Sequence, residues 1–175
     1  MKFTLKVPPS EISFWATEYE KHEDDAIAEA IGSRVRGAGV LTQYDFLRLA
    51  EWKTKRSKSR CRKNAAEYVD EVTRHALASR DARFKIEVLR LLDGVDWATA
   101  SVVLHFCDWE PWPILDVRAF WSLGQAVPAY ITFPIWQAYT TYTRALANKY
   151  GVSMRTLDRA LWGYSKEHQG KLDRR

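Results

Sequence analysis

The sequence predicts an all-α protein, and two observations predict it. Apolar residues recur every three or four positions over most of the chain, as in helices with one buried face. No segment alternates apolar and polar residues for long enough to form a strand. Hydrophobic residues make up 46% of the 175 positions, so the chain can bury a core. We expect one domain spanning residues 1–175.

Helix starts are marked by capping residues, since Ser, Thr and Asp accept a hydrogen bond from the first turn of a helix. The candidate caps, in chain order, are Ser10, Thr42, Asp81 and Ser153. Apolar stripes follow them. In the middle of the chain one stripe contains Ala65, Tyr68, Val69, Val72 and Ala76, and the next contains Phe84, Val88 and Leu91.

A helix from about residue 97 to 107 differs from the others. Ala100, Val103, Leu104 and Cys107 form one apolar face, while Val102 and Phe106 occupy a second. A helix that is apolar on several faces lies inside a core. Residues 109–118 then form a loop, because Pro111 and Pro113 disrupt a helix. Later helices follow Asp116 and Pro134.

Residues 92–100 form the first candidate site. A short turn containing Gly94 joins two predicted helices, and backbone N–H groups at the start of the second have no partner within that helix. Together with the positive end of the helix dipole they make a site suited to phosphate. An ordinary helical hairpin is the alternative interpretation.

Asp116 is the second candidate, between an apolar loop and an aromatic helix. It has two interpretations: the N-cap of the helix that follows, or a carboxylate that stabilises positive charge or activates water.

Taken together, the two candidates resemble the helix-hairpin-helix DNA glycosylase superfamily. Leu92-x-Gly94-Val95 and Thr99-Ala100 match the family's hairpin, and Ile114-Leu115-Asp116 matches the approach to its catalytic aspartate. The resemblance is strongest over residues 88–124. It implies a helix-hairpin-helix DNA glycosylase-like fold, and duplex DNA bound through the hairpin at Gly94, Val95, Asp96, Ala98 and Thr99. It also implies base flipping and cleavage of an N-glycosidic bond, with Asp116 stabilising the sugar cation or orienting water.

Three departures from the family pattern narrow this expectation. Ala98 occupies the position of the lysine that bifunctional members use as a nucleophile, so we expect a monofunctional enzyme of base excision repair without lyase activity. Asp96 replaces the second glycine of the turn, where its carboxylate would repel phosphate but could cap the helix starting at Trp97. Cys61 and Cys107 are too few for the iron–sulfur cluster of some relatives.

The third feature is a basic segment, residues 53–63, which holds seven of the chain's 27 Lys and Arg residues and no acid. Its candidate DNA contacts are Lys53, Lys55, Arg56, Lys58 and Arg60. Contact with phosphates is one interpretation and a solvated loop is the other. The net charge of +5 permits a nucleic-acid partner but does not require one.

Three tryptophans are candidates to line a base pocket, because aromatic faces stack on any base: Trp112, Trp52 and Trp109. Core packing is the alternative for each. His22, His75, His105 and His168 show no metal-ligand spacing, so we expect no metal and no cofactor. Cations around Cys61 are expected to lower the pKa of its thiol.

The sequence therefore favours a monomeric, monofunctional DNA glycosylase. Two alternatives stay open: a DNA-binding module without catalysis, and a helical interaction protein that has lost both functions. The N-terminus lacks the apolar core of a signal peptide and no run approaches the ~18 apolar residues of a membrane span. We therefore expect a cytoplasmic protein, associated with the nucleoid or nuclear, and no membrane partner.

Overall fold

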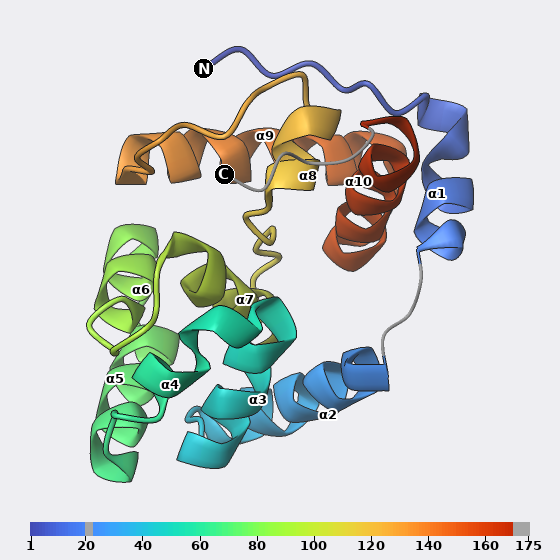
Figure 1. Cartoon of the computed structure of the whole chain (residues 1–175). Helices are drawn as coiled ribbons and strands as arrows, with labels where there is room; N and C mark the ends of the chain where they lie inside the picture. Colours follow the sequence, from blue (N-terminus) through green and yellow to red (C-terminus); the bar gives the residue numbers. More distant parts are fainter. Residues whose placement is uncertain (20–22, 170–175) are drawn as a thin grey trace. The chain divides into compact units, whose positions relative to one another are not determined.

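The computed structural model describes residues 1–19 and 23–169, and these residues form helices and loops without a strand (Figure 1). The all-α prediction is confirmed. The α-helices are α1 (Ile12–Glu18), α2 (Glu23–Ala38), α3 (Gln43–Lys53), α4 (Lys58–Cys61), α5 (Ala66–Ala78), α6 (Ala82–Leu89), α7 (Trp97–Cys107), α8 (Val117–Ser122), α9 (Phe133–Tyr150) and α10 (Met154–His168). Short 3-10 helices cover Pro9–Glu11 (η1) and Lys55–Ser57 (η2). None of the helices in the described ranges combines the length and apolar character that crossing a bilayer needs.

The chain divides into two compact units. Unit 1 comprises the described residues of Met1–Glu20 and Pro113–Arg175, and unit 2 those of Lys21–Trp112. Each unit has its own set of packed helices, and each is described by itself. The predicted hairpin and basic segment belong to unit 2, whereas Asp116 belongs to unit 1. The expectation of one domain stays a prediction.

Unit 2 is built around α7. Nine of its eleven residues are buried, and it packs against α2, α3 and α6, as the several-faced apolar pattern predicts. Gly32 allows α2 to approach closely, because a Cβ atom there would lie 2.2 Å from the Phe106 carbonyl oxygen. Helices α5 and α6 lie side by side and complete the unit (Figure 1).

The predicted buried face of α6 is wrong. Phe84 and Leu91 are exposed, Leu91 by 61%, while Lys85, Ile86 and Leu89 are buried. Lys85 is buried because its ammonium group forms an ion pair with Asp108 and donates to the Leu77 carbonyl oxygen. A buried charge that is paired and hydrogen-bonded avoids most of the cost of losing water.

The stripe on α5 is right except at two positions. Val69, Val72 and Ala76 are buried, whereas Tyr68 and Ala65 are exposed. Ala65 is the residue before the helix, so its side chain does not continue the helical face.

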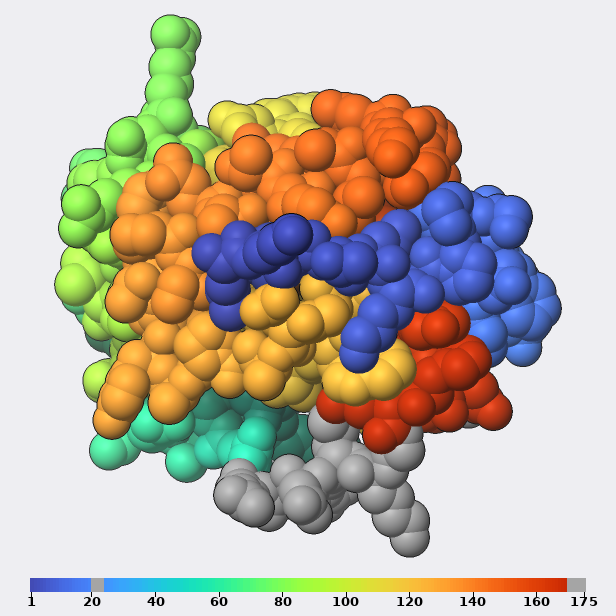
Figure 2. Space-filling view, turned by 90° about the horizontal axis from the view of Figure 1, so that it is seen from above, coloured from blue at the N-terminus to red at the C-terminus, as the bar shows by residue number. Residues whose placement is uncertain are grey.

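Unit 1 consists of α1, α8, α9 and α10 with the N-terminal segment laid across them. Figure 2 shows this segment, in dark blue, over the yellow and orange surface of α8 and α9. Two backbone hydrogen bonds hold it, from Thr4 N–H to the Leu123 carbonyl at 2.9 Å and from Lys6 N–H to the Ser122 carbonyl at 2.8 Å. Phe3 packs edge-on against the ring of Phe120.

Most predicted caps are confirmed. The side chains of Thr42, Asp81 and Ser153 each accept a hydrogen bond from a backbone N–H of the first turn of α3, α6 and α10. Ser10 is not a cap, because it lies within η1 and α1 begins two residues later at Ile12. The capping rule depends on neighbours along the chain, which is why it succeeds for α3, α6 and α10.

Candidate functional site

The hairpin forms as predicted in unit 2. Helix α6 ends at Leu89 and α7 begins at Trp97. Residues 92–95 make a tight turn closed by a hydrogen bond from Val95 N–H to the Leu92 carbonyl at 3.1 Å. Gly94 has a φ of 81°, the value required at the third residue of a type II turn. A side chain is strained in that conformation, so glycine is the residue that fits.

The hairpin positions predicted to bind DNA differ in exposure. Val95 and Thr99 are buried, and Ala98 is half-buried. Within residues 92–99, Asp93 and Asp96 are the exposed residues.

Asp96 is the N-cap of α7, as predicted. Its Oδ1 accepts a hydrogen bond from Trp97 N–H at 2.7 Å, and its side chain is 80% exposed. The guanidinium group of Arg90 lies 3.6 Å from Oδ1 and 4.3 Å from the centre of the Trp97 ring. The Asp96 carboxylate thus faces solvent beside the cation of Arg90.

The basic segment is folded and only partly free to bind an anion. Lys53 is the half-buried last residue of α3, and Lys58 forms an ion pair with Glu51. The hydrogen bond from Lys58 lowers the pKa of Glu51, which keeps that carboxylate charged. Lys55, Arg56 and Arg60 are exposed.

Cys61, the last residue of α4, lies against the hairpin turn. A Cβ atom on Gly94 would lie 2.8 Å from Cys61 Sγ, so the two segments touch. The expectation of a lowered pKa is wrong: the pKa of Cys61 is raised, because loss of hydration on burial outweighs the nearby charge of Arg60. The thiol therefore has the character of a packing group and not of a nucleophile.

Asp116 lies in unit 1 at the start of α8. Its Oδ1 accepts a hydrogen bond from Arg118 N–H at 2.9 Å, which confirms the N-cap interpretation. The residue is half-buried, unlike the exposed Asp96. A carboxylate in this position is held by the helix start, and capping leaves its negative charge in place for chemistry.

Tyr139 holds the loop that leads to Asp116, a role that the sequence did not indicate. Its hydroxyl group donates to the Ile114 carbonyl at 2.8 Å, and its ring stacks on Phe120 with centres 4.9 Å apart. The pKa of Tyr139 is raised well above its ordinary value, first by burial and then by the negative charges of Asp158 and Asp116. No local sequence signal reveals a hydrogen bond between groups 25 residues apart.

The three candidate tryptophans have different environments. Trp112 is buried, with 2% of its surface exposed. Trp52 is half-buried, donates from Nε1 to Asp25 at 2.7 Å and packs edge-on against Phe106. Trp109 is 78% exposed, so it offers an open ring face to a ligand. Of these three, Trp109 is the one placed to stack on a base without rearrangement.

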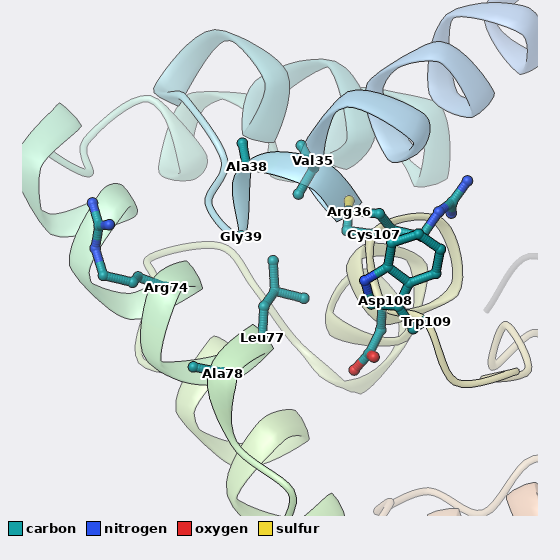
Figure 3. Close-up of a pocket in the computed structure, with 10 residues that line it drawn as sticks. All are labelled: Val35, Arg36, Ala38, Gly39, Arg74, Leu77, Ala78, Cys107, Asp108 and Trp109. Atoms are coloured by element: carbon teal, nitrogen blue, oxygen red, sulfur yellow. The ribbon is translucent and has the colours of Figure 1, made fainter.

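Trp109 borders a pocket of about 260 Å³ at the C-terminal end of α7 (Figure 3). Val35, Leu77 and Cys107 provide apolar lining, and Arg36 lies 5.8 Å from the centre of the Trp109 ring. Burial raises the pKa of Cys107 to about 12, so this thiol is neutral. An eleven-residue helix is about 16 Å long, which separates this pocket from the hairpin at the other end of α7.

The histidines within the described residues belong to no metal site. The Nδ1 of His105 donates to the Trp112 carbonyl at 2.6 Å, which satisfies one ring nitrogen. Within residues 1–19 and 23–169, no three His, Cys, Asp or Glu side chains gather closely enough to hold a metal ion. His22 lies outside the described residues.

No family model, curated protein or solved structure matches this chain.

Proposed function

We propose that this protein is a monofunctional DNA glycosylase that hydrolyses the N-glycosidic bond of a damaged or modified base in duplex DNA. The observation that carries the proposal is the α6–α7 hairpin with its type II turn at Gly94, followed one helix and one loop later by Asp116 at the start of α8. These are the elements on which the resemblance to helix-hairpin-helix DNA glycosylases depends.

In the proposed reaction the hairpin amides hold a phosphodiester while one nucleotide leaves the base stack. The bond between C1′ and the base nitrogen breaks, and the base leaves with the electron pair and takes up a proton. Positive charge then develops on the sugar, and the Asp116 carboxylate stabilises it. Water adds to C1′ and loses its proton, which leaves an abasic site.

Ala98 limits the chemistry to hydrolysis. Its methyl side chain cannot attack C1′ or form a Schiff base, whereas the lysine of bifunctional relatives can. The proposed products are a free base and an intact strand with an abasic site. We place the activity in base excision repair, in the compartment that holds DNA, with the protein acting as a monomer.

A DNA-binding module without catalysis is the second candidate. The exposed carboxylate of Asp96 at the hairpin favours it, because a negative charge beside a phosphate weakens binding. This candidate predicts salt-dependent DNA binding and no abasic product from any substrate.

The experiment is a panel of duplexes with different modified bases, assayed for abasic sites with native protein and with Asp116→Asn. Asparagine caps a helix as well as aspartate, so the variant keeps the fold and loses the charge. We expect the rate of base release to fall by about 10²- to 10³-fold. Asp81→Asn is the matched control, since Asp81 caps α6 in the same way, and it is expected to keep full activity.

Two results would contradict the proposal. Base release that is undiminished in Asp116→Asn would remove the assigned role of the carboxylate. A covalent DNA adduct trapped by borohydride would exclude the monofunctional mechanism. Binding without product from every duplex would favour the non-catalytic module.

A further inference from the structure

Asn64 connects the basic segment to the hairpin turn. Its side chain is buried and forms hydrogen bonds with both backbone groups of Asp93: Nδ2 donates to the Asp93 carbonyl at 3.0 Å, and Oδ1 accepts from Asp93 N–H at 2.8 Å. The same Nδ2 donates to the Cys61 carbonyl at 2.8 Å. One amide side chain thus ties the end of α4 to the residue before Gly94.

Further contacts hold the same two segments in one register. The Gln43 side chain on α3 donates to the Asn64 carbonyl at 2.5 Å. A Cβ atom on Gly94 would lie 3.0 Å from the Cβ of Arg60, so Arg60 begins beside the turn. Burial raises the pKa of the Cys61 thiol. The charge of Arg60 lowers this pKa and the charge of Asp93 raises it, so both charged groups lie near the thiol.

The charges around the turn explain why the position of α4 against the turn matters. Asp93 and Asp96 place two carboxylates where a phosphate would approach. Arg90 lies beside Asp96, at 3.6 Å. Arg60, carried by α4, begins beside Gly94, and its charge acts on Cys61 next to the turn. If α4 moved away from the turn, Asp93 would face the phosphate without that cation.

We propose that Asn64 is a positioning residue of the DNA-binding surface: it holds α4 against the hairpin so that Arg60 and the hairpin amides contact the same phosphodiester strand. This inference rests on the proposed function. It makes the hairpin and the end of the basic segment one binding surface, and it assigns the phosphate contact to Arg60 and the alignment to Asn64.

The test is binding of a fluorescein-labelled unmodified duplex of about 20 base pairs, titrated at several salt concentrations. Affinity falls as salt rises, and each phosphate contact makes the slope of log affinity against log salt more negative by about 0.9. We expect Arg60→Gln to make the slope less negative by about 0.9, and Asn64→Ala to change it by a similar amount although it removes no charge. We expect Asn64→Ala to weaken binding about tenfold near 0.1 M salt, where one well-placed cation has an effect of this order.

The double variant separates alignment from general damage. If Asn64 acts through Arg60, Asn64→Ala combined with Arg60→Gln should bind no more weakly than the worse single variant. Asn148→Ala and Arg83→Gln are matched controls, since Asn148 is exposed on α9 and Arg83 is exposed on α6 in an ion pair with Glu87. Neither is expected to change the slope.

The outcomes distinguish this inference from the function on which it rests. A native protein that does not bind DNA at low salt overturns both. Native binding with an unchanged slope in Asn64→Ala and Arg60→Gln overturns only this inference, as do fully additive losses in the double variant. Arg60 is exposed, so Arg60→Gln is expected to fold, and an unchanged slope in that variant alone would overturn the inference even if Asn64→Ala does not fold.

Discussion

Asp96 and Asp116 have the same local role in the two units and very different surroundings. Each is the N-cap of the helix that follows. Oδ1 of Asp96 accepts a hydrogen bond from the N–H of the first residue of α7, and Oδ1 of Asp116 accepts one from the N–H of the second residue of α8. Asp96 is exposed, beside Arg90, after a turn that depends on Gly94. Asp116 is half-buried, after a loop whose Ile114 carbonyl is bound by the buried Tyr139.

This difference shows that helix capping and catalysis depend on separate properties of an aspartate. A cap requires an oxygen at the right position in the chain, which an aspartate supplies in either unit. Catalysis by a carboxylate requires a charge held in place with limited access of water. Asp116 meets this second requirement better than Asp96, because part of its surface is covered and its loop is anchored.

The largest expected effect comes from a substitution at Gly94, in the turn that leads to Asp96. Gly94→Ala should lower the free energy of unfolding by about 2–5 kcal/mol, from backbone strain at positive φ and from overlap with Cys61. Gly151→Ala is the matched control, because Gly151 has a φ of 63° but nothing within 4 Å of its Cβ position. The control should lose about 1 kcal/mol in chemical denaturation, and equal losses would show that contact with Cys61 is unimportant.

The next largest effect should come from Tyr139, which anchors the loop that leads to Asp116. Tyr139→Phe leaves the buried Ile114 carbonyl without its donor, which costs about 1–3 kcal/mol. It should also slow base release without weakening DNA binding, since the loop before Asp116 loses its anchor. Tyr130→Phe, at an exposed tyrosine, should stay within about 0.5 kcal/mol of the native protein. If Tyr139→Phe left the free energy of unfolding unchanged, the Ile114 carbonyl would have another hydrogen-bond donor.

Removing the caps themselves should have smaller and similar effects. Asp96→Ala and Asp116→Ala each delete the acceptor of one N–H group at a helix start, at a cost of about 1 kcal/mol. Replacement by asparagine should restore most of that stability in both units. Thermal unfolding of the native protein and these four variants would show it, and a much larger loss for one alanine variant would contradict the equivalence of the two caps.

The smallest expected effect is on DNA affinity, and it distinguishes the charge of Asp96 from that of Asp116. Asp96→Asn should raise DNA affinity about two- to fivefold, because it removes an exposed negative charge beside the proposed phosphate site. Base release should be retained, in contrast to Asp116→Asn. Competition binding at low salt is the measurement, and weaker binding by Asp96→Asn would show that its carboxylate does not face the phosphate.

Particular residues show where sequence reasoning reached its limit. The central position of α7 and the caps Thr42, Asp81, Asp96, Asp116 and Ser153 were predictable, because periodicity and capping depend on neighbours along the chain. The buried face of α6 was not, because a lysine counts as a surface residue until its distant partner is known. That partner is Asp108, which lies 23 residues away.

The sequence by itself determined most of the longer helices, the hairpin with its glycine and the capping roles of Asp96 and Asp116, but not the short helices of the basic segment. Each of these follows from interactions within a few residues. Only the tertiary structure decided that Asn64 binds Asp93 across 29 residues, that Tyr139 anchors the Ile114 carbonyl, and that burial raises the pKa of Cys61. The physical reason is that hydrogen bonding and loss of hydration depend on which groups packing brings together, and helical periodicity carries no information about those partners.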